Sequence, residues 1–144
     1  MNIYIESSIR STRKKTGVVG FVIEYEDGST FTQFGIVKEV TENESCLLAL
    51  RHALAKMKKP EVQVFISIWT DNRYLANAFW QGWIEKWREN DFKKSNGEDI
   101  SNREEWLETA KLLGTDEIEV HWKEEHSFKN WLKRECERRA TKYV

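Results

Sequence analysis

The segment EVQVFISIWT (61–70) constrains the fold most strongly, because it is nearly continuously apolar. A strand with one face in water alternates apolar and polar residues, whereas a strand buried on both faces shows no such alternation. Strands of the second kind are typical of parallel pairing in a sheet covered by helices. The segment therefore predicts a central parallel strand with helices packed around it.

Three earlier segments have the alternating or β-branched character of strands. They are residues 2–7, 17–25 and 30–37. In the first, Ile3 and Ile5 are expected on the buried side. The dipeptide Asp27-Gly28 predicts a tight hairpin turn between the second and third. Strands joined by hairpins are antiparallel neighbours, so we expect three antiparallel strands in this part of the chain.

Helices are predicted where apolar residues recur at helical spacing. One begins near Thr41, and the others cover 71–90, 102–113 and 128–140. Residues 117–122 form a short alternating strand before the last helix. This order predicts an α/β fold, in which a five-stranded mixed sheet, three strands antiparallel and two parallel, carries helices on both faces. We expect residues 1–144 to form a single domain.

Composition narrows the class of protein further. No apolar run approaches the roughly 18 residues of a membrane helix, and the first residues lack a signal-peptide pattern. The two cysteines, Cys46 and Cys136, are too few for a disulfide framework. We therefore expect a cytoplasmic, monomeric protein with reduced thiols and no membrane partner. The net charge of −1 hides a basic segment at residues 9–16, which would suit either a nucleic acid or an ordinary protein surface.

The segment TENESCLLALRHAL (41–54) offers two chemically useful side chains, Glu44 and Cys46, about 200° apart on a helix. The predicted apolar face runs through Cys46, Leu50, Ala53, Leu54 and Met57. Thr41 and Glu44 have the spacing of a capping box, in which each side chain accepts a hydrogen bond from the other residue's amide. We assign Glu44 to the helix end and Cys46 to the interior.

Four segments, in an order that covers nearly the whole chain, resemble type 1 ribonuclease H. WTDNRYLANAF is similar to the family's strand-end TDS-x-Y segment, and TENESCLLALRHAL to its TNN-x-x-E-x-x-AL helix. GWIEKW…EEW resembles the basic handle and the helix after it. WKEEHSFKNWLKRECERRA resembles the last strand, the histidine-containing loop and the final helix. The resemblance implies a ribonuclease H-like fold and cleavage of the RNA strand of RNA/DNA hybrids.

Members of this family hold two Mg²⁺ ions with four carboxylates, so the resemblance implies a site for Mg²⁺ or Mn²⁺. The matching positions are Glu6, Cys46, Asp71 and Glu137. Cys46 stands where the family has Glu, and Glu6 and Glu137 stand where it has Asp. A register shifted by one residue, with Cys136 in place of Glu137, stays open. Asp71 is also suited to cap a helix, and His126 matches the loop histidine that handles protons or products.

The resemblance also implies contacts with the nucleic-acid backbone. The candidate residues are Arg10, Arg13, Lys14, Lys15, Asn43, Asn72, Lys86, Arg88, Lys93 and Lys94. Trp80, Trp83 and Trp87 are interpreted as hydrophobic support for their helix and not as a stacking platform. Two hypotheses follow: a metal-dependent nuclease with a divergent active site, or an inactive relative that binds nucleic acid or protein.

Overall fold

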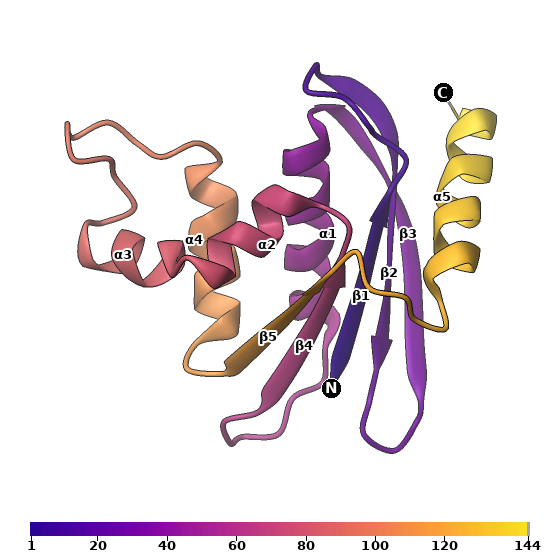
Figure 1. Ribbon diagram of the computed structural model, residues 1–144, viewed down its shortest axis with the longest axis horizontal. Coiled ribbons are helices and arrows are strands. Elements are labelled where there is room, and N and C mark those ends of the chain that lie inside the picture. Colours follow the sequence, from indigo (N-terminus) through magenta and orange to yellow (C-terminus); the bar gives the residue numbers. More distant parts are fainter. Residues whose placement is uncertain (144) are drawn as a thin grey trace.

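The computed structural model describes residues 1–143 (Figure 1). The strands are β1 (Asn2–Ser7), β2 (Lys15–Glu24), β3 (Thr30–Val40), β4 (Phe65–Thr70) and β5 (Glu117–Trp122). The helices are α1 (Glu42–Lys56), α2 (Arg73–Trp80), α3 (Trp83–Glu89), α4 (Arg103–Leu113) and α5 (Lys129–Tyr143). The sheet order is β3-β2-β1-β4-β5, with β1 and β5 parallel to β4 and β2 antiparallel to both of its neighbours. The predicted five-stranded mixed sheet is confirmed.

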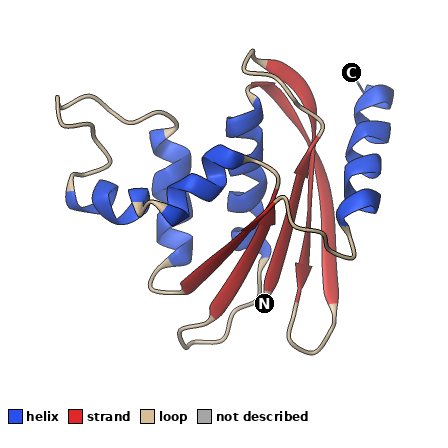
Figure 2. Cartoon of the chain, viewed as in Figure 1, coloured by secondary structure: helices blue, strands red, loops and turns tan. Residues whose placement is uncertain are grey.

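Helices cover the two faces of the sheet unequally. Figure 1 shows α1 and α5 on opposite sides of it, and Figure 2 shows the twist of the five strands between them. Because α5 packs on β1 and β2, Tyr4 and Glu6 are buried as well as Ile3 and Ile5. The sequence pattern had placed only the two isoleucines inside.

Among residues 1–143, no helix combines the length and apolar character needed to cross a lipid bilayer.

Two predicted boundaries were wrong. Residues 71–90 form two helices, because Gly82 adopts a left-handed conformation with φ of 65° between α2 and α3. The apolar periodicity continues across this break and so concealed it. The fourth strand begins at Phe65 and not at residue 61, since its pairing with β5 starts where Phe65 meets Glu117.

The largest part of the core lies between the sheet and helices α1 and α4. Trp106 is fully buried there, and its indole N–H donates a hydrogen bond to the Tyr74 hydroxyl at 2.8 Å. Trp83 and Trp87 pack against this core, as predicted. Trp80 does not, because its side chain is 53% exposed at the end of α2.

Candidate active site

Glu6 and Asp71 lie side by side at the ends of two neighbouring parallel strands. In the β1–β4 pairing Asn2 meets Ser67 and Tyr4 meets Trp69. Continuing this register by two residues places Glu6 opposite Asp71. The carboxyl ends of adjacent parallel strands are a common position for functional side chains, because both strands direct the residues that follow them to one edge.

Each of these two carboxylates is paired with a cation. Arg10 donates to Glu6 at 3.1 Å, and the Lys129 ammonium lies 3.3 Å from Asp71. Burial raises the pKa of Glu6, and the charge of Asp71 raises it further, whereas Arg10 acts in the opposite direction. The effect of the Asp71 charge on Glu6 agrees with the position of the two residues at the ends of neighbouring strands.

Helix α1 directs Cys46 toward this pair. Cys46 is buried, and its pKa is raised to about 12 by burial, by the charge of Glu42 and by that of Glu6. A buried hydrogen bond of 2.8 Å between the hydroxyls of Ser7 and Ser45 ties the end of β1 to the start of α1. The thiol is therefore neutral and fixed beside Glu6, as its predicted place in the helix requires.

The start of α1 carries half of the predicted capping box. The Thr41 hydroxyl accepts a hydrogen bond from the Glu44 amide at 3.2 Å. Within residues 1–143 the Glu44 carboxylate accepts no hydrogen bond from the Thr41 amide. The assignment of Glu44 to the helix end, away from Glu6, still holds.

Helix α5 brings Cys136, and not Glu137, into contact with β1. The Cys136 sulfur lies 3.8 Å from the Glu6 carbonyl oxygen, and burial and the charge of Glu6 raise its pKa to about 12. A Cβ atom at Gly20 would come within 3.1 Å of that sulfur, so this glycine permits the close approach. Glu137 is exposed one residue further on and lines a hollow together with Arg10.

His126 packs against the sheet near Asp71. Its ring centre lies 4.5 Å from that of Tyr4, and its Nδ1 accepts the Phe128 amide hydrogen at 3.2 Å. Burial lowers the pKa of His126, as does the charge of Lys129, while Asp71 acts in the opposite direction. His126 is therefore half-buried, and aromatic side chains hold its ring in place.

Sequence reasoning missed two charged residues of this region. Glu42 accepts a hydrogen bond from Asn72 at 3.1 Å, and Lys129 pairs with Asp71. Glu42 could have been found, because it precedes Cys46 by four residues and so shares its helix face. No sequence signal singles out Lys129, since its partner lies on another element.

The predicted nucleic-acid contacts separate into two groups. Arg13 and Lys14, in the loop before β2, and Lys15, the first residue of β2, are exposed. Lys86, Lys93 and Lys94 are exposed on α3 and the loop after it, at the left of Figure 1. Three others have partners within the protein. Arg10 pairs with Glu6, Arg88 donates to the Ala110 carbonyl, and Asn72 donates to Asn43.

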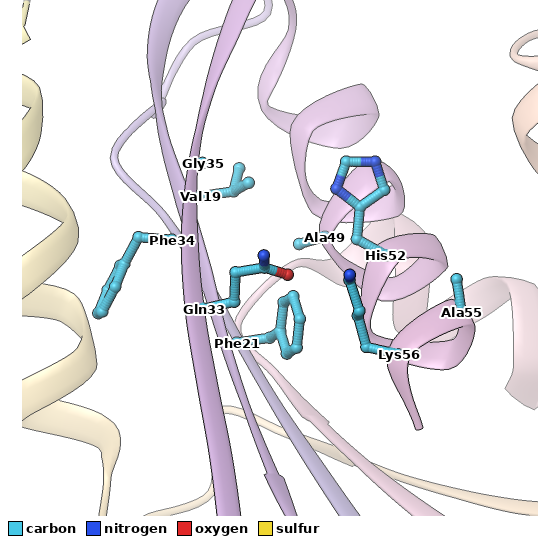
Figure 3. A pocket seen from close by; sticks show the side chains of 9 residues that line it. All are labelled: Val19, Phe21, Gln33, Phe34, Gly35, Ala49, His52, Ala55 and Lys56. Carbon is cyan, nitrogen blue, oxygen red and sulfur yellow. The ribbon is translucent and has the colours of Figure 1, made fainter. Parts of the chain in front are cut away.

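A hollow of about 340 Å³ lies elsewhere, between strands β2 and β3 and helix α1 (Figure 3). Its lining comprises Val19, Phe21, Gln33, Phe34, Gly35, Ala49, His52, Ala55 and Lys56. In Figure 3, Phe34 points away from it to the other side of the sheet. None of these residues is an acid, so the hollow offers no carboxylate to a hard cation.

Comparison with known proteins identifies the family. A family model described as RNase H matches residues 1–142. The chain is 35% identical over 107 residues to the Ribonuclease H of Acetivibrio thermocellus, which covers 74% of this chain and 70% of that protein. It is 31% identical over 113 residues to that of Caldanaerobacter subterraneus subsp. tengcongensis, covering 76% and 69%.

The chain belongs to the ribonuclease H family. Solved structures show the same fold in other RNase H proteins. LC9-RNase H1, a type 1 RNase H with the type 2 active-site motif, has a TM-score of 0.69 at 18% identity, covering 98% of this chain and 70% of its own. LC11-RNase H1 in complex with RNA/DNA hybrid has a TM-score of 0.65 at 18% identity, covering 97% and 98%.

The acidic residues of this ribonuclease H family member fit one hard cation better than two. Mg²⁺ is commonly held by one or two carboxylates together with water and substrate phosphate, and Glu6 and Asp71 supply such a pair. Neutral thiols at Cys46 and Cys136 are poor ligands for it. Within residues 1–143, no three Asp, Glu, His or Cys side chains are gathered closely enough to hold a metal ion.

Proposed function

We propose that the protein cleaves the RNA strand of RNA/DNA hybrids with the help of Mg²⁺ or Mn²⁺ held by Glu6 and Asp71. The observation that carries the proposal is the pairing of these two carboxylates at the ends of β1 and β4. The match to the RNase H family model over residues 1–142 supports the choice of substrate. When bound, the cation supplies Lewis-acid activation of the phosphate and of the attacking water.

Several residues of the chain have defined parts in this proposal. Arg10 and Lys129 neutralise the two acids in the free protein, and both are long enough to turn toward a substrate phosphate instead. Glu137 is the outer acid, on the hollow that Arg10 also lines. His126 Nδ1 accepts the Phe128 amide hydrogen, so a neutral ring carries its hydrogen on Nε2 and can donate a hydrogen bond to the leaving oxygen.

A second candidate function is hybrid binding without cleavage. It is favoured by a specific observation: Cys46, at a family carboxylate position, is a buried thiol, and the two acids at the strand ends already have protein cations as partners. In this case Arg10 and Lys129 would stand permanently in place of the metal.

Cleavage of an end-labelled RNA/DNA hybrid in Mg²⁺ and in Mn²⁺ distinguishes the two functions. We expect the wild type to cleave, and Asp71→Asn to lose at least about 100-fold of that rate, because losing a cation ligand costs several kcal/mol of transition-state stabilisation. Asp91→Asn, an exposed acid in the α3–α4 loop, is the matched control and should cleave normally. Salt-sensitive binding without cleavage in either cation would establish the second function instead.

The variant Cys46→Glu tests the contribution of α1. If this position belongs to the cation site, the new carboxylate should raise the cleavage rate, and Mn²⁺ should raise the melting temperature of the variant. If it does not, the buried charge beside Glu6 and Glu42 should destabilise the fold by at least about 2 kcal/mol with no recovery in Mn²⁺.

A further inference from the structure

Trp122, the last residue of β5, is fixed directly beside Asp71. Its indole N–H donates a hydrogen bond to the Asp71 carbonyl oxygen at 3.2 Å. Trp80 of α2 packs edge-on against the same ring, with 6.3 Å between the ring centres. The position and orientation of the Trp122 ring are thus set by two neighbouring elements.

Two cations lie over this ring. The Arg73 guanidinium is 5.1 Å from the ring centre and the Lys123 ammonium is 5.0 Å from it. Arg73 begins α2, two residues after Asp71, and Lys123 follows β5. A cation over an exposed aromatic face gains about 0.5–1 kcal/mol, enough to restrict where a long side chain points. We call Arg73, Lys123, Trp122 and Trp80 the Trp122 patch.

The positive charge of the Trp122 patch is available to a ligand. Within residues 1–143, the side chains of Arg73 and Lys123 make no hydrogen bond or ion pair with the protein, and both are exposed. The two acids that follow Lys123 have other partners: Glu124 contacts His121 at 2.9 Å and Glu125 contacts Lys129 at 3.7 Å. Arg10 and Lys129, the other cations near Asp71, form ion pairs with carboxylates, whereas Arg73 and Lys123 do not.

We propose that Arg73 and Lys123, held by Trp122, bind backbone phosphate of the nucleic-acid strand that passes Asp71. Exposed cations beside an accessible aromatic ring are a combination by which proteins hold a nucleic-acid strand, and here the half-buried Trp122 orients the cations while Trp80 is exposed next to it. Cations that are already oriented lose less side-chain entropy on binding. The identity of the substrate rests on the proposed function, but this contact requires no divalent cation.

The test is hybrid binding measured by fluorescence anisotropy in EDTA over a series of salt concentrations. The variants Arg73→Gln and Lys123→Gln should each weaken binding and reduce the slope of log K against log salt by about one, because each removes one phosphate contact. The double variant should lose about twice as much. Lys111→Gln, an exposed cation on α4, is the matched control and should change neither quantity.

Unchanged affinity and slope in both single variants would overturn the inference. An equal loss of affinity for polyglutamate would also overturn it, because the patch would then be a general anion site that binds acidic proteins as well. Wild-type protein that binds hybrid through this patch but cleaves it in neither Mg²⁺ nor Mn²⁺ would overturn the proposed nuclease activity and support the patch. Wild-type protein that cleaves hybrid, together with variants that both bind hybrid normally, would support the nuclease activity and overturn the role of the patch.

Discussion

Glu6 is a buried carboxylate whose position at the site lowers the stability of the fold. Its side chain is 4% exposed, between the β2 backbone and α5, and it forms an ion pair with Arg10, which is 43% exposed. An ion pair with one member in water returns little energy, whereas burying the other member costs more. A carboxylate kept in such a position is better explained by a role at the site than by a role in stability.

Glu6→Gln is therefore predicted to be more stable than the wild type at pH 7. Because the pKa of Glu6 is higher in the folded chain than in the unfolded chain, its penalty is absent below the unfolded-state pKa of about 4.3 and complete above the folded-state pKa. The advantage of the variant should shrink as the pH falls toward 4. Urea unfolding at several pH values measures it.

The control for this prediction is Glu98→Gln, an exposed acid in the loop before α4, which should alter stability little at any pH. If Glu6→Gln were less stable than the wild type at pH 7, the Arg10 pair would outweigh the burial of Glu6, and the direction of the pKa shift would be wrong.

Among the elements, α1 and α2 are joined at their first turns by one side chain. Asn72 caps α2, because its side-chain oxygen accepts the Leu75 amide hydrogen at 2.8 Å. Its amide nitrogen donates to Glu42 at 3.1 Å and to Asn43 at 2.9 Å, both on α1. From the sequence, Asp71, one residue earlier, was also suited to cap this helix. With Asn72 as the cap, the Asp71 carboxylate is left for Lys129 and for a ligand.

Asn72→Ala is predicted to lower the free energy of unfolding by about 2 kcal/mol, roughly 1 for the cap and the rest for the two buried bonds to α1. Asn77→Ala, within α2 and without a side-chain hydrogen bond, is the matched control and should be close to neutral. Urea denaturation followed by circular dichroism measures both. A loss in Asn72→Ala no greater than in the control would show that the bridge contributes nothing to stability.

At the scale of the whole molecule, β1 connects two apolar clusters. The larger cluster lies under α1 and α4, and the smaller one, formed by Tyr4, Val22 and Leu132, lies under α5. Ile3 faces the first and Tyr4 the second, so neither cluster can open without exposing β1. Shared strands of this kind make unfolding cooperative.

We predict a single unfolding transition. Fluorescence from the seven tryptophans, which include residues of both clusters, and far-ultraviolet circular dichroism should give the same urea midpoint. Different midpoints would show that part of the secondary structure is lost separately from the apolar clusters.

The chemistry of the site was less predictable than its location. From the resemblance, Glu6 and Asp71 could be placed at the ends of the first and fourth strands, because both strands are recognisable in the sequence. The register of the final helix stayed open between Cys136 and Glu137, because a shift of one residue on a helix moves a side chain by about 100° and leaves the apolar pattern nearly intact. The Cys136 sulfur contacts the Glu6 carbonyl oxygen, so Cys136 faces the sheet and Glu137 is exposed beside it.

The sequence by itself determined the succession of strands along the chain, the antiparallel pairing of the first three and the burial of Cys46. These features depend on local periodicity, hairpin turns and the placement of apolar residues, which are properties of neighbouring positions. Only the tertiary structure decided that Arg10 and Lys129 pair with the acids, that Glu42 meets Asn72, and that Trp122 carries two free cations beside Asp71. Such contacts depend on the distance and direction between side chains of separate elements, and chain spacing does not encode either.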